Sequence, residues 1–443
     1  MTGSDVGDTL DRVEFAGLKR RLYGLAFVDE FGPIYAVYTL WFNDNGITTA
    51  QLSTVFLLWA LTALALEIPS GALADRVDRR RLLGAAFAIR AVAIVLWLVW
   101  PTLTGLAIGT ALWALHDALA SGAWEALIHD ELDTIGRARW YAPVMARIGQ
   151  FSHLGVAAGT LVGAGLLWLD VGLVTLGWLT VAAHVGSISL VLTLPDASRR
   201  RETRPRSAAE DADEGGADPT TDRSIGGGPV AGTILADVAP DDSFSYREWW
   251  ATLRSGVRDA RTDPVLTRLV VVGAMLEGLF IVDEYVPLLV RARGGVDAQA
   301  SVVVLVVWVG LLVGGEVAAR RPALSGRVLG TTLIAGVTVM TFAFVTSSVW
   351  TLMLVGIGYA ALQAVWIATD ARLQERTPSD TRATVTSVRG VGSATISMAA
   401  FIVIGAMADG DDPTPGQFVV LAALAIAGVL VVRWLPRPAE MGT

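Results

Sequence analysis

Twelve long apolar runs dominate this chain of 443 residues, and each is long enough to cross a lipid bilayer as a helix. A helix needs about 20 apolar residues to span the hydrocarbon core. Only 17% of the residues are charged, compared with about a quarter in a soluble protein. Because lipid offers no partners for free backbone groups, each run is expected to be helical. The runs lie near residues 18–42, 50–74, 82–100, 103–127, 143–168, 171–194, 266–290, 297–319, 327–346, 349–371, 383–407 and 415–435.

Arginine residues alternate between the loops in a way that sets the orientation. The loops on one side hold nearly all of them, whereas the loops on the other side hold only Arg291 and Arg293. Positively charged loops stay in the cytoplasm. Both chain ends fall on the arginine-rich side, so we expect an even number of spans, cytoplasmic N- and C-termini and a location in the cell membrane.

A polar segment divides the chain into two halves. Residues 195–245 are rich in glycine, proline and charge, which predicts a disordered cytoplasmic linker. Over residues 246–263 the apolar side chains form one helical stripe and the arginines lie off it, which favours an amphipathic helix in the membrane interface. A short soluble linker helix is the alternative. We predict six-helix bundles over residues 1–194 and 264–443.

The two halves share polar residues that their apolar composition does not explain. Four residues recur at one constant offset: Gly24, Asp29, Glu30 and Pro33 correspond to Gly278, Asp283, Glu284 and Pro287. Repeated halves related by an axis along the membrane normal are typical of transporters, whose sites lie between the halves near the bilayer midplane. We therefore expect an all-α membrane protein with twelve transmembrane helices in two pseudo-symmetric six-helix bundles.

Ionisable residues lie in the middle of several runs, where each costs about 3 kcal/mol. Such residues persist where they face a water-filled cavity or a partner. Burial disfavours the charged form of a carboxylate, so acids here are suited to carrying protons or binding a substrate donor. The alternative is that they pair with Arg90 or with each other and only hold helices together. The candidates for a proton-coupling or substrate cavity are Asp29, Glu30, Pro33, Arg90, Asp117, Asp283, Glu284 and Pro287.

The two prolines predict a kinked helix in each half. Pro33 has no N–H, so the carbonyl of Asp29, four residues earlier, loses its helical hydrogen bond. Pro287 has the same relation to Asp283. Each kink would combine a carboxylate with a free carbonyl. His116 could relay protons beside Asp117 or could only satisfy a local hydrogen bond.

The loop between the second and third runs, GALADRVDRRRLL over residues 71–83, carries a recognisable motif. It resembles the loop signature of the major facilitator superfamily, Gly-x-Leu-Ala-Asp-Arg-x-Gly-Arg-(Arg/Lys). Asp78 stands where the family has its second glycine. The resemblance implies a latch that stabilises the outward-open state, whereas the arginine run could also serve only to fix topology. The matching residues are Gly71, Leu73, Ala74, Asp75, Arg76, Arg79 and Arg80.

Further charges near the expected cytoplasmic ends are similar to the ion pairs that close the inner gate in this superfamily. Such pairs could break and re-form as the halves rock, and static packing is the alternative. These residues are Glu125, Asp130, Arg147, Asp370 and Arg389.

The resemblance does not identify a drug–proton antiporter subtype. Those proteins carry a helix-4 arginine four residues before a glycine, and the residue four before Gly122 is Ala118. They also carry a Gly-Pro pair in helix 5, whereas GVAAGTLVGAGLL has no proline. Its small residues still allow close helix packing.

These features favour a secondary transporter that moves a small solute by alternating access. No P-loop run is present, and the mid-span acids outnumber Arg90, which favours proton-coupled efflux of an apolar or cationic compound. Uptake of a sugar or other metabolite by proton symport is the alternative, and a non-transporting membrane receptor or scaffold is a more remote one. The expected partners are a small-molecule substrate, protons and the lipid bilayer, with no nucleic acid, and we expect a monomer.

The residue types and their spacing also disfavour an enzymatic function. The chain contains no cysteine, and no nucleophile–base set falls at helical spacing. We therefore expect no catalytic residue, no metal and no cofactor. The four histidines are scattered without metal-ligand spacing: His116, His129, His153 and His184.

Overall fold

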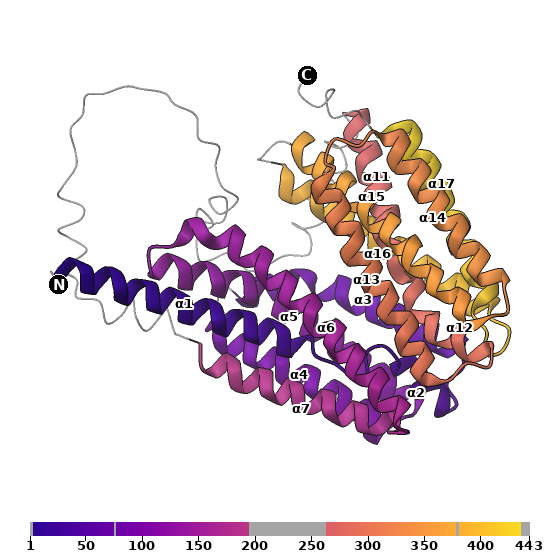
Figure 1. Ribbon diagram of the computed structural model, residues 1–443, viewed down its shortest axis with the longest axis horizontal. Coiled ribbons are helices and arrows are strands. Elements are labelled where there is room, and N and C mark those ends of the chain that lie inside the picture. The colour runs from indigo at the N-terminus through magenta and orange to yellow at the C-terminus, as the bar shows by residue number, and fades with distance from the viewer. Residues whose placement is uncertain (1–2, 75–76, 195–262, 378–380, 436–443) are drawn as a thin grey trace.

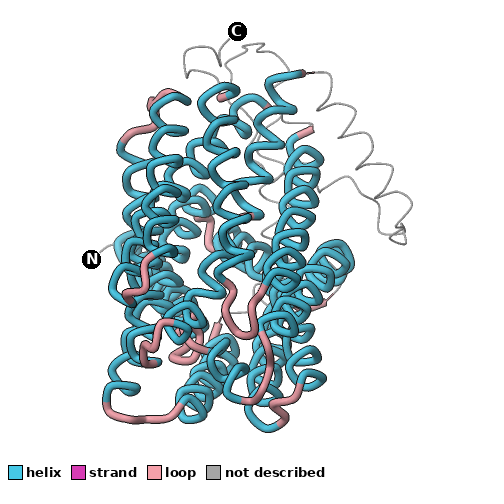
Figure 2. The backbone as a smooth tube through the Cα atoms, turned by 90° about the vertical axis from the view of Figure 1, so that its right-hand side faces the viewer, coloured by secondary structure: helices cyan, strands magenta, loops and turns pink. Residues whose placement is uncertain are grey.

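The computed structural model describes residues 3–74, 77–194, 263–377 and 381–435. The predicted linker over 195–245, nearly all of the predicted interfacial helix over 246–263, and the motif residues Asp75 and Arg76 lie outside the described residues. The described chain is helical almost throughout, and short loops join the helices (Figure 2). This agrees with the predicted all-α class.

Each half contains seven α-helices, and three short 3-10 helices are added to them, in the parts of the chain that the structure describes. The first half comprises α1 (Gly3–Asp29), α2 (Tyr38–Asp44), α3 (Thr49–Ala74), α4 (Arg79–Val99), α5 (Leu103–Thr134), η1 (Ala138–Trp140), α6 (Tyr141–Trp168) and α7 (Leu173–Leu192). The second half comprises α11 (Pro264–Gly278), η2 (Phe280–Tyr285), α12 (Val286–Ala292), α13 (Asp297–Arg320), α14 (Gly326–Val345), η3 (Val349–Leu354), α15 (Val355–Arg376), α16 (Arg382–Met407) and α17 (Thr414–Trp434).

Eleven helical segments among the described residues are long and apolar enough to cross a membrane. The chain is therefore a polytopic α-helical membrane protein. The predicted run over 18–42 is missing from these eleven, because α1 ends at Asp29 and irregular turns occupy the next eight residues before α2 begins at Tyr38.

The expectation of kinked but continuous helices at Pro33 and Pro287 is wrong. In the first half the helix ends four residues before Pro33, and the Gly32–Pro33 pair disfavours helical geometry there. In the second half α11 ends at Gly278, and the 3-10 segment η2 precedes α12. Pro287 lies in the first turn of α12, where its missing N–H is tolerated. Both acidic pairs therefore lie where a membrane helix is interrupted.

The two halves form separate groups of helices. In Figure 1, α1 to α7 lie together in indigo to magenta, and α11 to α17 lie together in orange to yellow. The groups meet near α2 and α12 and diverge away from them. Between the halves, α3 packs along α16 and α6 packs along α13.

Glycines on α6 allow the interrupted end of α1 to lie very close. A Cβ atom at Gly155 would lie 2.3 Å from the carbonyl oxygen of Phe27, and one at Gly159 would lie 2.7 Å from the amide nitrogen of Gly32. One at Gly163 would lie 2.4 Å from the Pro33 carbonyl oxygen. This close contact positions Asp29 and Glu30 against the rest of the half.

Candidate cavity between the two halves

A cavity of about 810 Å³ lies between the two halves of the molecule. Six of its lining residues are acids or bases with a formal charge at neutral pH: Glu30, Arg90, Asp117, Glu277, Asp283 and Glu284. Ten are aromatic: Tyr35, Tyr38, Phe56, Trp59, Trp97, Trp113, Phe280, Trp308, Tyr359 and Phe401. Of the candidate cavity residues, Pro287 also lines the cavity, whereas Asp29 and Pro33 do not belong to its lining. The other candidate residues line the cavity from both halves: Glu30, Arg90, Asp117, Asp283 and Glu284.

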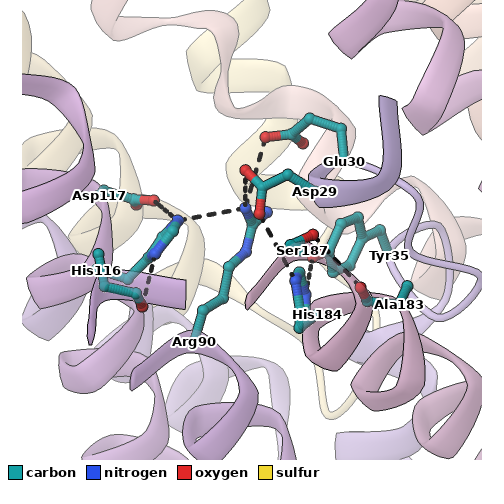
Figure 3. Close-up of polar contacts among 10 residues, drawn as sticks. Asp29, Glu30, Tyr35, Arg90, His116, Asp117, Ala183, His184 and Ser187 are labelled. Carbon is teal, nitrogen blue, oxygen red and sulfur yellow. Dashed lines mark hydrogen bonds and ion pairs between the residues drawn. The ribbon is translucent and has the colours of Figure 1, made fainter. Parts of the chain in front are cut away.

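Arg90 on α4 is the centre of a charged cluster in the first half (Figure 3). Its Nη1 lies 3.5 Å from Asp29 Oδ2, 3.5 Å from Glu30 Oε1 and 3.3 Å from His116 Nε2. The guanidinium also lies over the ring of Trp113, 4.7 Å from its centroid. Asp29 and Glu30 therefore both pair with Arg90, which is the alternative that the sequence left open for these two acids.

His116 and Asp117 lie beside this cluster. His116 Nδ1 is 2.9 Å from the Ala86 carbonyl oxygen, so Nδ1 carries the proton and Nε2 faces Arg90 as an acceptor. This arrangement assigns His116 a local hydrogen-bonding role. The Asp117 carboxylate is 39% exposed and its only ion-pair neighbour among the described residues is His116, at 3.9 Å.

His184 on α7 is a member of the cluster that sequence reasoning did not single out. It is fully buried, with Nε2 2.7 Å from the Tyr35 hydroxyl and Nδ1 3.7 Å from Asp29 Oδ1. Tyr38 and Tyr359 were missed in the same way. Each is a polar side chain within or beside an apolar run, and that signal could have identified all three.

The acids of the second half have different partners. Tyr359 on α15 has its hydroxyl 2.8 Å from Asp283 Oδ1, and Tyr38 on α2 donates a close hydrogen bond to Glu284 from the opposite half. No arginine, lysine or histidine lies within ion-pair distance of either acid in the described ranges. The repeated Asp-Glu pair therefore contacts Arg90 in one half and tyrosine hydroxyls in the other.

Arg389 on α16 pairs within the second half. It contacts Glu277 on α11 closely, and its Nη2 lies 3.8 Å from Asp370 Oδ1 on α15. Glu277 lines the cavity, but the sequence gave no reason to expect its pairing with Arg389. The predicted proximity of Arg389 and Asp370 is present, and their gating role stays a prediction.

The other loop-motif and gate residues lie within the first half. Arg79 pairs closely with Asp130 on α5, and Arg80 donates to the Leu194 carbonyl at 3.0 Å. Arg147 is exposed and bonds Gln150 at 2.9 Å, and Glu125 is also exposed. Gly71 lies in the last turn of α3. None of these contacts bridges the two halves, so their roles as latch and gate also stay predictions.

Polar contacts between the halves cluster at the end that contains α2 and α12, which we call the α2–α12 end. Arg291 Nη1 lies 2.5 Å from Asp44 Oδ1, Thr49 Oγ1 donates to the Asp411 carbonyl at 2.8 Å, and Ser53 Oγ lies 2.7 Å from the Tyr285 hydroxyl. The opposite, arginine-rich end shows no such contact among the described residues. The cavity is therefore closed at the α2–α12 end, and the halves diverge towards the arginine-rich end (Figure 1).

The chain matches a sequence model of the Major Facilitator Superfamily over residues 22–401. No curated protein sequence matches it significantly. Similar solved structures include the nucleoside transporter NupG, with 13% identity and a TM-score of 0.64 over 96% of this chain and 99% of that one. A D-xylose-proton symporter has 13% identity and a TM-score of 0.62, covering 97% and 98%. A bacterial homologue of the human lysosomal transporter Spinster, in an inward-facing conformation, has 17% identity and a TM-score of 0.59, covering 94% and 93%. At sequence identities this low, the comparison with these structures shows a similar fold and nothing more.

Proposed function

Because this chain belongs to the Major Facilitator Superfamily, and is therefore a transporter rather than an enzyme, we propose that it moves a small organic solute across the cell membrane by proton-coupled alternating access. The observation that carries this proposal is the cavity between the halves. Three of its carboxylates, Asp117, Asp283 and Glu284, have no arginine or lysine partner among the described residues. A carboxylate that lines a cavity without a fixed counter-ion can bind either a proton or a cation.

The lining favours a cationic or apolar solute. Aromatic faces attract cations by about 0.5–2 kcal/mol each, and ten aromatic side chains line the same cavity as the three carboxylates. No asparagine or glutamine lines this cavity in the described part of the chain, although amide side chains are well suited to hydrogen-bonding the hydroxyl groups of a sugar. We therefore place export of an apolar or cationic compound first. A proton and a cation that compete for the same carboxylates must exchange across the membrane.

The same proposal includes the topology. The segment of α1, the turns over residues 30–37 and α2 makes the twelfth crossing, which brings both termini to the cytoplasmic side. The cavity then faces the cytoplasm in this conformation. In the outward-facing state the arginine-rich ends approach each other, and the loop motif with Asp75, Arg76, Arg79 and Arg80 closes them together with Glu125, Asp130, Arg147, Asp370 and Arg389.

Uptake of a sugar or other metabolite with protons is a second candidate. Structures of the same fold include a D-xylose-proton symporter, and a proton bound to Asp283 or Glu284 could equally accompany a solute inward. The two candidates differ in the relative direction of the proton and the solute.

Transport by purified protein in liposomes separates them. Ethidium is used as the aromatic cationic probe, and an enclosed pH dye reports proton movement. Exchange predicts that ethidium and protons move in opposite directions, and that Asp117→Asn combined with Glu284→Gln reduces the initial rate at least tenfold. Co-movement of protons with xylose or a nucleoside, without ethidium movement, would replace export by uptake.

A further inference from the structure

The hydroxyl group of Tyr359 lies between three polar groups of the interrupted helix. Its oxygen is 2.7 Å from the Asp283 amide nitrogen, 2.8 Å from Asp283 Oδ1 and 2.5 Å from the Phe280 carbonyl oxygen. Tyr359 itself is only 1% exposed, so bulk water does not compete for these contacts. Each distance is that of a hydrogen bond.

A count of protons shows that this cluster lacks one. The Asp283 amide supplies the proton for the first contact. The two remaining contacts each join two oxygen atoms, yet the tyrosine hydroxyl has a single proton to donate. When Asp283 is ionised, Tyr359 can donate either to the carboxylate or to the Phe280 carbonyl. In the contact that is left, two acceptor oxygens face each other with no proton between them. A proton on Asp283 satisfies both, because Asp283 then donates to Tyr359 and Tyr359 donates to Phe280.

We propose that Asp283 binds the coupling proton and that Tyr359 is its positioning residue. The step is a simple transfer: a hydronium ion in the cavity gives its proton to Asp283 Oδ1, leaving water, and the Tyr359 hydroxyl turns from Asp283 to the Phe280 carbonyl. Asp283 lines the cavity, so water can reach it. This assignment rests on the proton coupling in the proposed function.

The surroundings of Asp283 are consistent with a proton rather than a metal or an arginine partner. The titratable groups that face this segment are Glu284 beside it, Tyr359 from α15, Tyr38 from α2 on Glu284, and Tyr285 in the same 3-10 helix. No basic side chain lies within ion-pair distance in the described residues. The matching residue of the other half, Asp29, lies 3.5 Å from Arg90 and 3.7 Å from His184. Of the two matched aspartates, only Asp283 therefore lacks a basic neighbour among the described residues.

Infrared difference spectroscopy of the reconstituted protein tests this assignment without any substrate. As the pH is lowered, the wild type should gain the carbonyl band of a protonated carboxylic acid. Asp283→Asn should lose the component of that band that Asp283 contributes, and Tyr359→Phe should shift the frequency and the pH midpoint of that component. Tyr285→Phe is the matched control, because its equally buried hydroxyl contacts Ser53 instead of an acid, and it should leave the band unchanged.

Two results would overturn the assignment: an Asp283→Asn spectrum with the full acid carbonyl band of the wild type, or Tyr359→Phe and Tyr285→Phe spectra that both equal the wild type. The liposome measurement tests proton coupling independently of the assignment to Asp283. If wild-type liposomes show no proton movement with any solute, coupling is wrong even where Asp283 titrates. If coupling is present and Asp283→Asn retains both the band and the coupling, only the assignment to Asp283 is wrong.

Discussion

Arg90 is only 4% exposed on α4, and its guanidinium lies 3.5 Å from both Asp29 and Glu30. The repeated acids Asp283 and Glu284 meet tyrosine hydroxyls instead. A charge that is taken out of water needs a partner, and removing one member of a buried pair leaves the other uncompensated. Asp29 and Glu30 are thereby tied to an arginine, whereas Asp283 and Glu284 face the cavity without a basic partner among the described residues.

Replacing Arg90 should destabilise the protein more than replacing an exposed arginine. Arg90→Met keeps much of the side-chain length but leaves Asp29 and Glu30 without a counter-ion, at an expected cost of about 3 kcal/mol. Arg79→Met breaks the pair with Asp130, whose two side chains are about one-third exposed, and should cost below about 1 kcal/mol. Denaturant unfolding in detergent measures both. Equal losses for the two variants would show that the Arg90 cluster is not a stabilising unit.

Asp263 supplies a prediction about pH outside the membrane-spanning segments. It accepts hydrogen bonds from the Val265 amide at 2.8 Å and from Arg376 Nε at 2.9 Å. Burial acts to raise the pKa of Asp263, but the Arg376 and backbone hydrogen bonds outweigh it, so the pKa lies below its ordinary value. A carboxyl whose pKa is lowered by folding stabilises the fold at pH values above its pKa in the unfolded state. This contribution is lost as the pH falls through the lowered pKa of the folded state.

Asp263→Asn keeps a capping side chain and removes only the charge. At pH 7 it should lower the unfolding free energy by up to about 1 kcal/mol, since the pair is about one-third exposed. The difference from the wild type should shrink as the pH falls below about 4. Melting curves of both proteins across this range check it, and a difference that is independent of pH would contradict the role of the charge.

At the scale of elements, α6 determines where the interrupted helix of the first half lies. Its glycines lie against backbone atoms of Phe27, Gly32 and Pro33 at distances that leave no room for a side chain. Small residues are a general means of bringing membrane helices together. Here the close contact also holds the turn that carries Glu30 beside Arg90.

Gly159→Ala should therefore destabilise the protein by about 1–3 kcal/mol, because the added methyl group meets the rigid backbone at Gly32. Gly165→Ala on the same helix is the matched control, since no atom lies within 4 Å of its Cβ position. It should be neutral or slightly stabilising. Thermal melting in detergent compares them, and identical melting temperatures would show that α6 can move away without cost.

At the scale of the whole molecule, the two halves are joined at the α2–α12 end. The Arg291–Asp44, Thr49–Asp411 and Ser53–Tyr285 contacts connect them there. Alternating access requires these contacts to break when the cavity opens to the other side. A covalent bond at this end should therefore stop the cycle in the present conformation.

The pair Ser53→Cys and Gly405→Cys provides that bond. A Cβ at Gly405 would lie 2.8 Å from the Ser53 Cβ, close enough for a disulfide after a small shift. The chain has no cysteine of its own, so no other thiol interferes. Oxidation should abolish ethidium movement in liposomes and reductant should restore it, while each single variant stays active under oxidant. Full transport by the oxidised double variant would mean that the α2–α12 end does not open.

Much of the membrane architecture could be predicted from composition and periodicity alone. Eleven of the twelve apolar runs coincide with helical segments that could cross a membrane, because the bilayer imposes one length and one backbone geometry on a span. The superfamily resemblance, first seen in residues 71–83, is confirmed by the match over residues 22–401. The helix breaks at Asp29 and Gly278 were not predicted, because a proline suggests a kink without showing on which side the helix ends.

By itself, the sequence determined that the chain crosses a membrane many times, that it repeats itself, and that acids lie at matched places in both repeats. These properties follow from local chemistry, since hydropathy and residue identity do not depend on how the helices pack. Only the tertiary structure decided which acids meet Arg90, which meet Tyr38 and Tyr359, and which end of the cavity is closed. Partners such as Arg90 and Asp29 are far apart along the chain, and only the packing of both α1 and α4 against α7 brings their side chains within reach.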